Sequence, residues 1–221
     1  MVGPIAKRGV IAIPTVEALG TAIADAFDKE EEGLLFHHEL VEGKRTPIRV
    51  ERLIDRSKVV TDVCEQAQRL AEAVCGRKLK VFKDKVNAKN PNGGGHFLAH
   101  QDTPAFAPHG DWHISVLVPV TPFTKASGTL EFAAEVPTTP MEELAALEYT
   151  AVEAEPGDAV IFGGLIPHRS GPNTTDRPRI GIVFTFVDQS AELDRDQYYA
   201  AKAKGIEGMS LHQVDFTGEL V

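Results

Sequence analysis

Cysteine, tryptophan and long apolar runs are scarce in this chain of 221 residues, which has two cysteines and one tryptophan. Cys64 and Cys75 lie in one stretch with helical spacing, where a rise of about 1.5 Å per residue puts them roughly 16 Å apart. That separation is too long for a disulfide. The absence of a predicted disulfide is typical of proteins in a reducing compartment. No apolar run approaches the roughly 18 residues of a membrane span, and Pro14 interrupts an N-terminal stretch already too short for a signal peptide. We therefore expect a cytoplasmic protein that does not bind membranes.

Basic residues are outnumbered: 23 lysines and arginines face 32 aspartates and glutamates, a formal net charge of −9. A nucleic-acid-binding protein needs a basic footprint, so the composition argues against that class and also disfavours a polyanionic ligand such as a coenzyme A thioester. The rest of the composition, 43% hydrophobic and 25% charged, is typical of a globular domain. We expect a small molecule as the partner. The sequence gives no indication of how many subunits associate.

The first third of the chain has a helical pattern. Apolar spacing predicts a helix over residues 16–29 with Thr15 as its N-cap, and a second helix that follows Ser57 and ends at Gly76. Residues 33–55 have a mixed pattern and are not assigned. The adjacent His37 and His38 are expected at the surface or in a loop, because neighbours on a regular element point apart.

After Gly76 the character changes to short β-like runs separated by clusters of Gly, Pro, Asn and Asp. This spacing is typical of a β-sandwich or jelly roll. The expected strands are residues 79–89, 97–102, 112–121, 129–134, 149–153, 159–162, 165–169 and 179–187. The remaining expectations are a short helix at 141–147 and a C-terminal helix at 192–204, with Gly205 past its end.

No linker-like stretch separates these parts, so we expect one domain over residues 1–221. It would consist of a helical part (about 1–76), a β core (about 77–190) and a C-terminal helix (about 191–205). The predicted class is mainly β with flanking helices.

The residues that carry chemistry centre on His100-Gln101-Asp102. On a strand, residues i and i+2 point to the same face, so His100 and Asp102 can reach one metal ion. His168 lies on a later β-like run that can fold back beside them. Two imidazoles and one carboxylate on one face form the triad of non-haem Fe(II) oxygenases, whose open positions accept a chelating cosubstrate and dioxygen.

Arg179 and Ser170 strengthen the interpretation. An isolated His-x-Asp is common by chance, and a lone histidine is usually structural. Arg179 lies 11 residues after His168, where a guanidinium can form a fork on the distal carboxylate of 2-oxoglutarate. Ser170, two residues after His168, can donate a second hydrogen bond to that carboxylate. These additions at workable spacing favour a metal site.

Four stretches between residues 83 and 204 carry a resemblance to a known family: KDKVNAKNPNGGGHFLAHQDTPAF, SGTLEFAAEV, EPGDAVIFGGLIPHRSGPNTTDRPR and DRDQYYAAKAK. The sequence resembles the phytanoyl-CoA dioxygenase-like branch of the Fe(II)/2-oxoglutarate-dependent oxygenases. The resemblance implies a double-stranded β-helix, a cupin-like jelly roll with iron in its mouth. It matches His100, Asp102 and His168 with the iron ligands of that family.

The same resemblance matches Arg179 and Ser170 with the residues that hold the distal carboxylate of the cosubstrate. Leu117 falls near the position where some members have a tryptophan that contacts the cosubstrate, so that contact is not expected here. Related halogenases replace the carboxylate ligand with a small residue. Asp102 is present in this chain, so we expect hydroxylation or another oxidation.

Polar residues alternate with others along residues 82–89. The resemblance implies that Lys85 and Asn87 face into the barrel. There Lys85 would meet a carboxylate or phosphonate of the cosubstrate or substrate, and Asn87 would contact the substrate. The alternative is a solvated edge strand, where lysine is common as a gatekeeper.

Three further residues are candidate substrate contacts. His113 shares strand parity with Leu117 and so faces the same interior, either as a substrate contact or as a satisfied core histidine. His109 and Trp112 are assigned to the loop at about residues 103–111. Loops of this kind shape substrate sites on the jelly-roll fold, whereas a lone tryptophan more often serves packing.

Together these features predict an Fe(II)- and 2-oxoglutarate-dependent dioxygenase. It would oxidise a small polar molecule, in particular by hydroxylation, and release succinate and carbon dioxide. Two alternatives stay open. A cupin-type metalloenzyme without 2-oxoglutarate would explain part of the motif around His100 but would leave Arg179 unexplained. A non-catalytic ligand-binding barrel would bind iron without consuming dioxygen.

Overall fold

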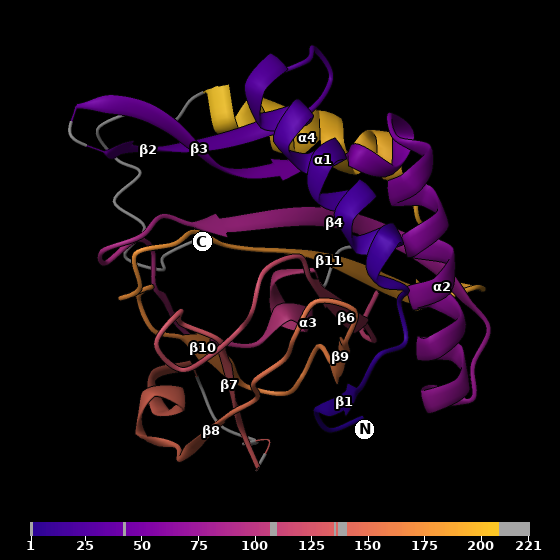
Figure 1. Cartoon of the computed structure of the whole chain (residues 1–221). Coiled ribbons are helices and arrows are strands. Elements are labelled where there is room, and N and C mark those ends of the chain that lie inside the picture. The colour runs from indigo at the N-terminus through magenta and orange to yellow at the C-terminus, as the bar shows by residue number, and fades with distance from the viewer. Residues whose placement is uncertain (1, 42, 107–109, 135, 137–140, 208–221) are drawn as a thin grey trace.

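The computed structural model of the protein describes residues 2–41, 43–106, 110–134, 136 and 141–207 (Figure 1). Its strands form two antiparallel sheets. The large sheet has the order β1 (Ile5–Lys7), β9 (Ala159–Gly163), β6 (Ile114–Pro119), β11 (Arg179–Asp188), β4 (Leu79–Lys89), β3 (Lys44–Glu51), β2 (Leu35–Val41). The small sheet has the order β5 (Phe97–His100), β10 (His168–Ser170), β7 (Leu130–Ala133), β8 (Tyr149–Ala151). The predicted jelly roll with flanking helices is confirmed.

Two long helices, α1 (Ile13–Lys29) and α2 (Lys58–Cys75), cover the outer face of the large sheet (Figure 1). α1 starts three residues earlier than predicted, with Ala12 as its N-cap and Pro14 in its first turn, where a missing N–H costs nothing. α2 ends at Gly76, whose φ of 69° is a left-handed conformation that glycine adopts without strain.

Strand alternation separates two interiors. One face of the central strands is apolar and packs on α1 and α2 through residues such as Val86, Val116 and Phe184. The other face looks toward the small sheet and combines an apolar cluster around Phe132 and Phe162 with many charged side chains. Each fully buried apolar side chain stabilises the fold by about 1.5–3 kcal/mol. The two-sided burial holds the large sheet as a rigid platform for the polar face.

The first third of the chain is less helical than expected. Three of the strands fall there, and the unassigned residues 33–55 form the β2–β3 hairpin, which joins β4 through the pair Arg49–Asn87. His37 and His38 are buried on β2, so their placement at the surface was wrong. Smaller elements are the 3₁₀ helices η1 (Leu53–Asp55) and η3 (Met141–Ala146) and the one-turn α3 (Asp102–Ala105).

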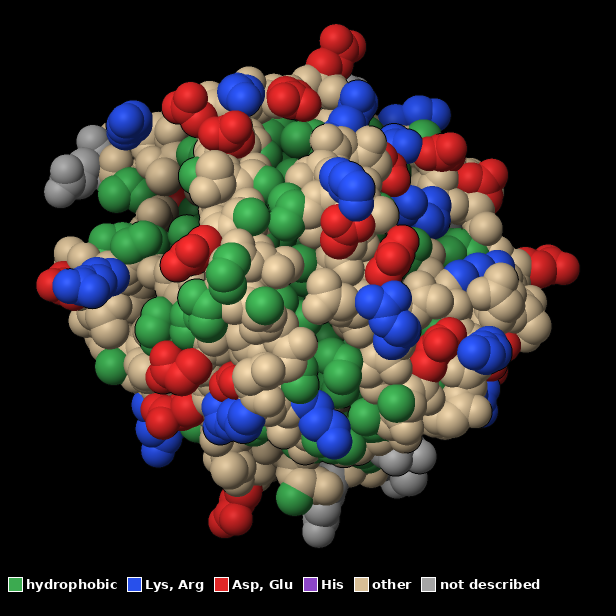
Figure 2. Space-filling view, turned by 45° about the vertical axis from the view of Figure 1, so that its right-hand side comes forward, with side chains coloured by type: hydrophobic (Ala, Val, Ile, Leu, Met, Phe, Trp, Pro, Cys, Tyr) green, Lys and Arg blue, Asp and Glu red, His purple; other side chains and the backbone are tan. Residues whose placement is uncertain are grey.

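The C-terminal helix α4 (Arg195–Glu207) starts three residues later than predicted, and Gly205 lies within it rather than beyond its end. Cys64 and Cys75 are both free thiols. No helix within the described ranges combines the length and apolar character needed to cross a membrane. Figure 2 shows acidic and basic side chains interspersed over one face of the molecule, without a continuous basic area among the described residues there, in agreement with the low basic content.

Candidate metal centre

The three predicted metal ligands come from two paired strands and the helix that follows one of them. His100 ends β5 and His168 begins β10, and the antiparallel register puts them opposite each other. Asp102 is the first residue of α3 rather than a strand residue, because β5 ends at His100. The Gln101 side chain donates to the Leu165 carbonyl at 2.6 Å and so ties the turn between His100 and Asp102 to the segment that precedes β10.

The ligand atoms of the triad converge. His100 Nε2 lies 4.0 Å from Asp102 Oδ1, and His168 Nε2 lies 3.9 Å from Asp102 Oδ2. The two imidazole centroids are 4.3 Å apart, and the three ligand atoms all lie within 4.8 Å of one another. This arrangement lets one ion contact all three side chains from one side.

Backbone carbonyls orient both imidazoles. His100 Nδ1 donates to the Leu98 carbonyl at 2.8 Å, and His168 Nδ1 donates to the Ile166 carbonyl at 3.0 Å. A proton on Nδ1 leaves the Nε2 lone pair free, and Nε2 is the atom that faces Asp102 in both rings. Such carbonyl partners are the usual way in which proteins fix the tautomer of a metal-binding histidine.

The charge states also suit a metal. Burial, followed by the neighbouring His168, lowers the pKa of His100 to about 4. Burial also lowers the pKa of His168. Burial alone would raise the pKa of Asp102, but Lys85 and the two imidazoles hold the pKa of that carboxyl well below its ordinary value. At neutral pH the site therefore offers two neutral imidazoles and one carboxylate, the donor set of the facial triad.

We expect metal affinity to persist in mild acid because burial lowers the pKa of both imidazoles, that of His100 to about 4. A decrease from pH 7 to 5.5 should weaken Mn(II) binding less than about tenfold, whereas two imidazoles with the ordinary pKa of about 6.5 would weaken it roughly 70-fold. Calorimetric titrations at the two pH values measure this ratio. A loss above about tenfold would contradict the neutral assignment.

A second polar group lies behind the triad at the start of β11. Arg179 is 3% exposed, its Nη1 donates to the Gly128 carbonyl at 2.8 Å, and its guanidinium lies 4.2 Å from the Phe123 ring centroid. Its Nε has no hydrogen-bond partner among the described residues. Ser170, also buried, accepts a hydrogen bond from Lys89 Nζ at 2.7 Å.

Lys89 is a residue that sequence reasoning did not assign to this group. It lies directly opposite Arg179 in the β4–β11 register. Burial and then Arg179 lower the pKa of Lys89 to about 6, and burial lowers the pKa of Arg179 to about 9. An incoming carboxylate would stabilise the charged forms of both side chains and so raise both pKa values again. The signal in the sequence was the strand alternation, which puts Lys89 on the same face as Lys85.

Of the other predicted site residues, some lie in the interior of the fold and one lies away from the triad. Lys85 and Asn87 lie on the inner face of β4, and Lys85 is close enough to Asp102 to influence its pKa. His113 is buried between the rings of Phe82 and Phe106 at centroid distances of 5.5 and 5.3 Å.

Trp112 packs beside the core on the helical side and lies 4.8 Å from the Arg77 guanidinium, away from the triad. The structure therefore does not support a substrate contact for Trp112. His109 lies outside the described residues, so its assignment is not addressed by the structure.

A jelly roll that gathers two imidazoles and one carboxylate at the end of paired strands defines the class of mononuclear non-haem metal oxygenases. The sequence matches the protein-family model of phytanoyl-CoA dioxygenase (PhyH) over residues 8–181. The chain belongs to this family, and we conclude that it is an oxygenase.

Two curated relatives are similar over most of the chain. A 2-aminoethylphosphonate dioxygenase from the uncultured bacterium HF130_AEPn_1 is 34% identical over 174 residues, which are 72% of this chain and 66% of the relative. A methylphosphonate hydroxylase from Gimesia maris is 31% identical over 207 residues, which are 87% of this chain and 76% of the relative.

Solved structures share the fold at lower identity. The α-ketoglutarate-dependent epimerase SnoN from nogalamycin biosynthesis has a TM-score of 0.73 at 19% identity and covers 87% of this chain and 80% of its own. EctD from S. alaskensis, solved with bound Fe, has a TM-score of 0.74 at 18% identity and covers 88% of this chain and 75% of its own. These similarities support the architecture described above.

Proposed function

We propose that the protein is an Fe(II)- and 2-oxoglutarate-dependent dioxygenase. It hydroxylates a small polar molecule and releases succinate and carbon dioxide. One observation carries this proposal: the triad of His100, Asp102 and His168 is joined, through Ser170 on the strand of His168, to a buried basic pair, Arg179 and Lys89. A dicarboxylate with a keto acid at one end needs both features.

The residues present fit both groups. The triad would hold Fe(II) through His100 Nε2, Asp102 and His168 Nε2 and leave adjacent coordination positions open. Arg179, with Lys89 and Ser170 beside it, would bind the distal carboxylate of 2-oxoglutarate and so orient the keto acid end toward the metal. Bound Fe(II) supplies the activation of dioxygen that is coupled to oxidative decarboxylation of the cosubstrate.

The relatives favour a substrate class. Both are named for phosphonates, 2-aminoethylphosphonate in one case and methylphosphonate in the other. We propose a small organophosphonate as the substrate of this chain. A cupin-type enzyme without 2-oxoglutarate would leave the buried Arg179 and Lys89 without a ligand, and membership of a dioxygenase family disfavours a non-catalytic barrel.

Succinate formation tests the proposal. Purified protein is incubated with Fe(II), 2-oxoglutarate, dioxygen and a panel of phosphonates, and each of the first three components is omitted in turn. Succinate should form only in the complete mixture and should increase with at least one phosphonate. Protein that binds iron but never converts 2-oxoglutarate with any member of the panel would overturn the proposed activity.

A further inference from the structure

A second group of cations lies on the inner face of the large sheet, where β3 and β4 pair. The register places Arg49 opposite Asn87 and Glu51 opposite Lys85. Lys83 precedes Lys85 by two residues, the spacing that keeps strand side chains on one face. Arg49 is 4% exposed, Glu51 0% and Lys83 4%, so charged groups are buried here at high density.

Glu51 is the central anion of this group. It accepts a hydrogen bond from Lys202 Nζ at 2.6 Å, and Arg49 Nη1 lies 3.9 Å from the same carboxylate oxygen. Burial opposes ionisation of Glu51, but Lys202, Lys83 and Arg49 lower the pKa of its carboxyl to about 2. One carboxylate therefore faces several cations.

Lys83 and Lys85 share the nearby carboxylates of Glu51 and Asp102 with other basic or metal-binding groups. Within the described part of the chain, neither ammonium group makes a hydrogen bond or ion pair. Lys83 Nζ instead lies 3.9 Å from the Phe106 ring centroid and 6.0 Å from the Tyr198 centroid. Burial of an ammonium without an acceptor is costly, and cation–π contact compensates for only part of that cost. An anion that binds from outside would offset this cost.

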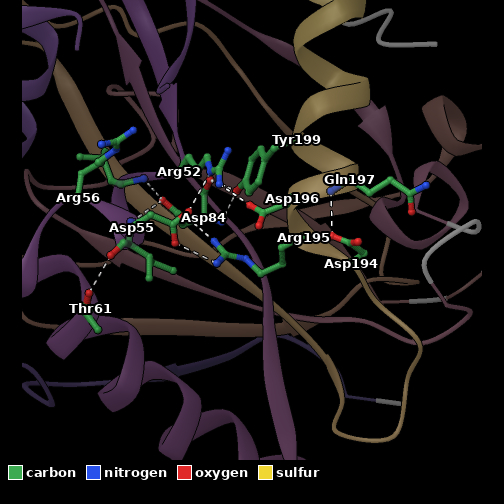
Figure 3. Close-up of polar contacts among 12 residues, drawn as sticks. Arg52, Asp55, Arg56, Thr61, Asp84, Asp194, Arg195, Asp196, Gln197 and Tyr199 are labelled. Atoms are coloured by element: carbon green, nitrogen blue, oxygen red, sulfur yellow. Dashed lines mark hydrogen bonds and ion pairs between the residues drawn. The ribbon is translucent and has the colours of Figure 1, made fainter. Parts of the chain in front are cut away.

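The helix α4 brings Lys202 into this group. At its start, Arg195 reaches Asp55 at 3.1 Å and Asp84 at 3.5 Å, while Arg52 pairs with Asp55 and with Asp196 (Figure 3). This network holds the helix beside β3 and β4.

Lys202 follows Arg195 by seven residues, close to two helical turns, which returns it to the same side of the helix. It therefore reaches Glu51 from the helix while Arg49 reaches it from β3.

The cationic group adjoins the metal triad. Lys85 and Lys83 are both near enough to Asp102 to hold the pKa of that carboxyl low. Lys83 also contacts Phe106, the residue that follows α3 and therefore lies four positions after the metal ligand. An anion bound between these lysines would thus lie next to the metal and apart from Arg179.

We propose that Arg49, Lys83 and Lys85, together with Lys202 from α4, bind the dianionic head group of the substrate beside the metal triad. This inference rests on the proposed function for the identity of the substrate as a phosphonate. Three oxygens and two negative charges match several convergent cations better than a planar carboxylate with one charge does. The site therefore selects phosphonates over carboxylates.

Binding of methylphosphonate and acetate to the full chain loaded with Mn(II) and 2-oxoglutarate tests this site by calorimetry. Methylphosphonate should bind at least about tenfold more tightly than acetate, and Lys83→Met or Lys85→Met should each weaken methylphosphonate binding at least about tenfold. Lys202→Met should weaken it to a smaller extent. Lys78→Met, which removes a largely exposed ammonium just before β4, is the matched control and should bind as the wild type does.

A stability measurement distinguishes a binding role from a structural one. Without ligand, Lys83→Met should melt at the wild-type temperature or above, because it removes a buried charge that lacks an acceptor. Unchanged methylphosphonate affinity in both Lys83→Met and Lys85→Met, or equal affinity for acetate, would overturn the site. A separate 2-oxoglutarate titration on the Mn(II)-loaded wild type tests the proposed function: failure there rejects the dependence on 2-oxoglutarate, whatever the methylphosphonate titration with Mn(II) alone shows about the anion site.

Discussion

Asp102→Ala should abolish metal binding and turnover. The carboxylate is the only anion of the triad, and its loss leaves two imidazoles, His100 and His168, beside the positive charge of Lys85. Substitution of residues that merely support metal ligands lowers metal affinity or activity about 10- to 100-fold, so loss of a ligand should cost at least about 1000-fold. Calorimetry with Mn(II) and succinate formation with Fe(II) measure the two effects.

The exposed Asp111 offers the matched control. Asp111→Ala removes the same group from the surface and should leave Mn(II) affinity and turnover at the wild-type level. Retention of Mn(II) affinity in Asp102→Ala, within about threefold of the wild type, would show that the metal is held elsewhere.

Arg179→Met should weaken 2-oxoglutarate binding about 100-fold, because it removes the buried guanidinium that would bind the distal carboxylate. The variant should also lose the preference of the wild type for 2-oxoglutarate over 2-oxobutyrate, which lacks that carboxylate. Folding should be little affected, since the described contacts of the guanidinium are one carbonyl and one ring. Titration of both keto acids into the Mn(II)-loaded protein gives the two affinities.

Arg177→Met is the control that tests whether loss of any nearby positive charge would weaken 2-oxoglutarate binding. Arg177 is exposed two residues before Arg179, so its loss should not change either affinity. Lys89→Met should weaken 2-oxoglutarate binding about tenfold, a smaller effect because Lys89 also bonds Ser170 and the Gly171 carbonyl. Equal affinity of wild type and Arg179→Met for 2-oxoglutarate would remove the basis for a dicarboxylate cosubstrate.

The triad was predictable because its signal is local. His100 and Asp102 are two residues apart, and His168 lies on a run with clear strand character, so only one pairing had to be inferred. The exact end of β5 was not predictable, and Asp102 turned out to begin a helix. The three ligand atoms still converge, because Asp102 in the first turn of α3 stays next to the end of β5.

The cationic interior was less accessible to sequence reasoning. Alternating lysines on an antiparallel strand normally indicate a solvated face, and charged residues are rarely buried without partners. Lys89 breaks the first rule and Lys83 breaks both, because the fold buries the two side chains. The β2–β3 hairpin and Lys202 enter through contacts between residues far apart in sequence, which no local pattern reports.

The pairing of β4 with β11 has a consequence for how the protein acquires its metal. Arg179 lies opposite Lys89 and Asp188 opposite Leu79, so the central ladder joins segments about a hundred positions apart. Chains dominated by such distant contacts fold slowly. A nascent chain that has emerged only as far as His100 still lacks β10, the strand that pairs with β5 and carries His168. The three metal ligands therefore come together late, and a redox-active ion binds only to a chain that is largely folded.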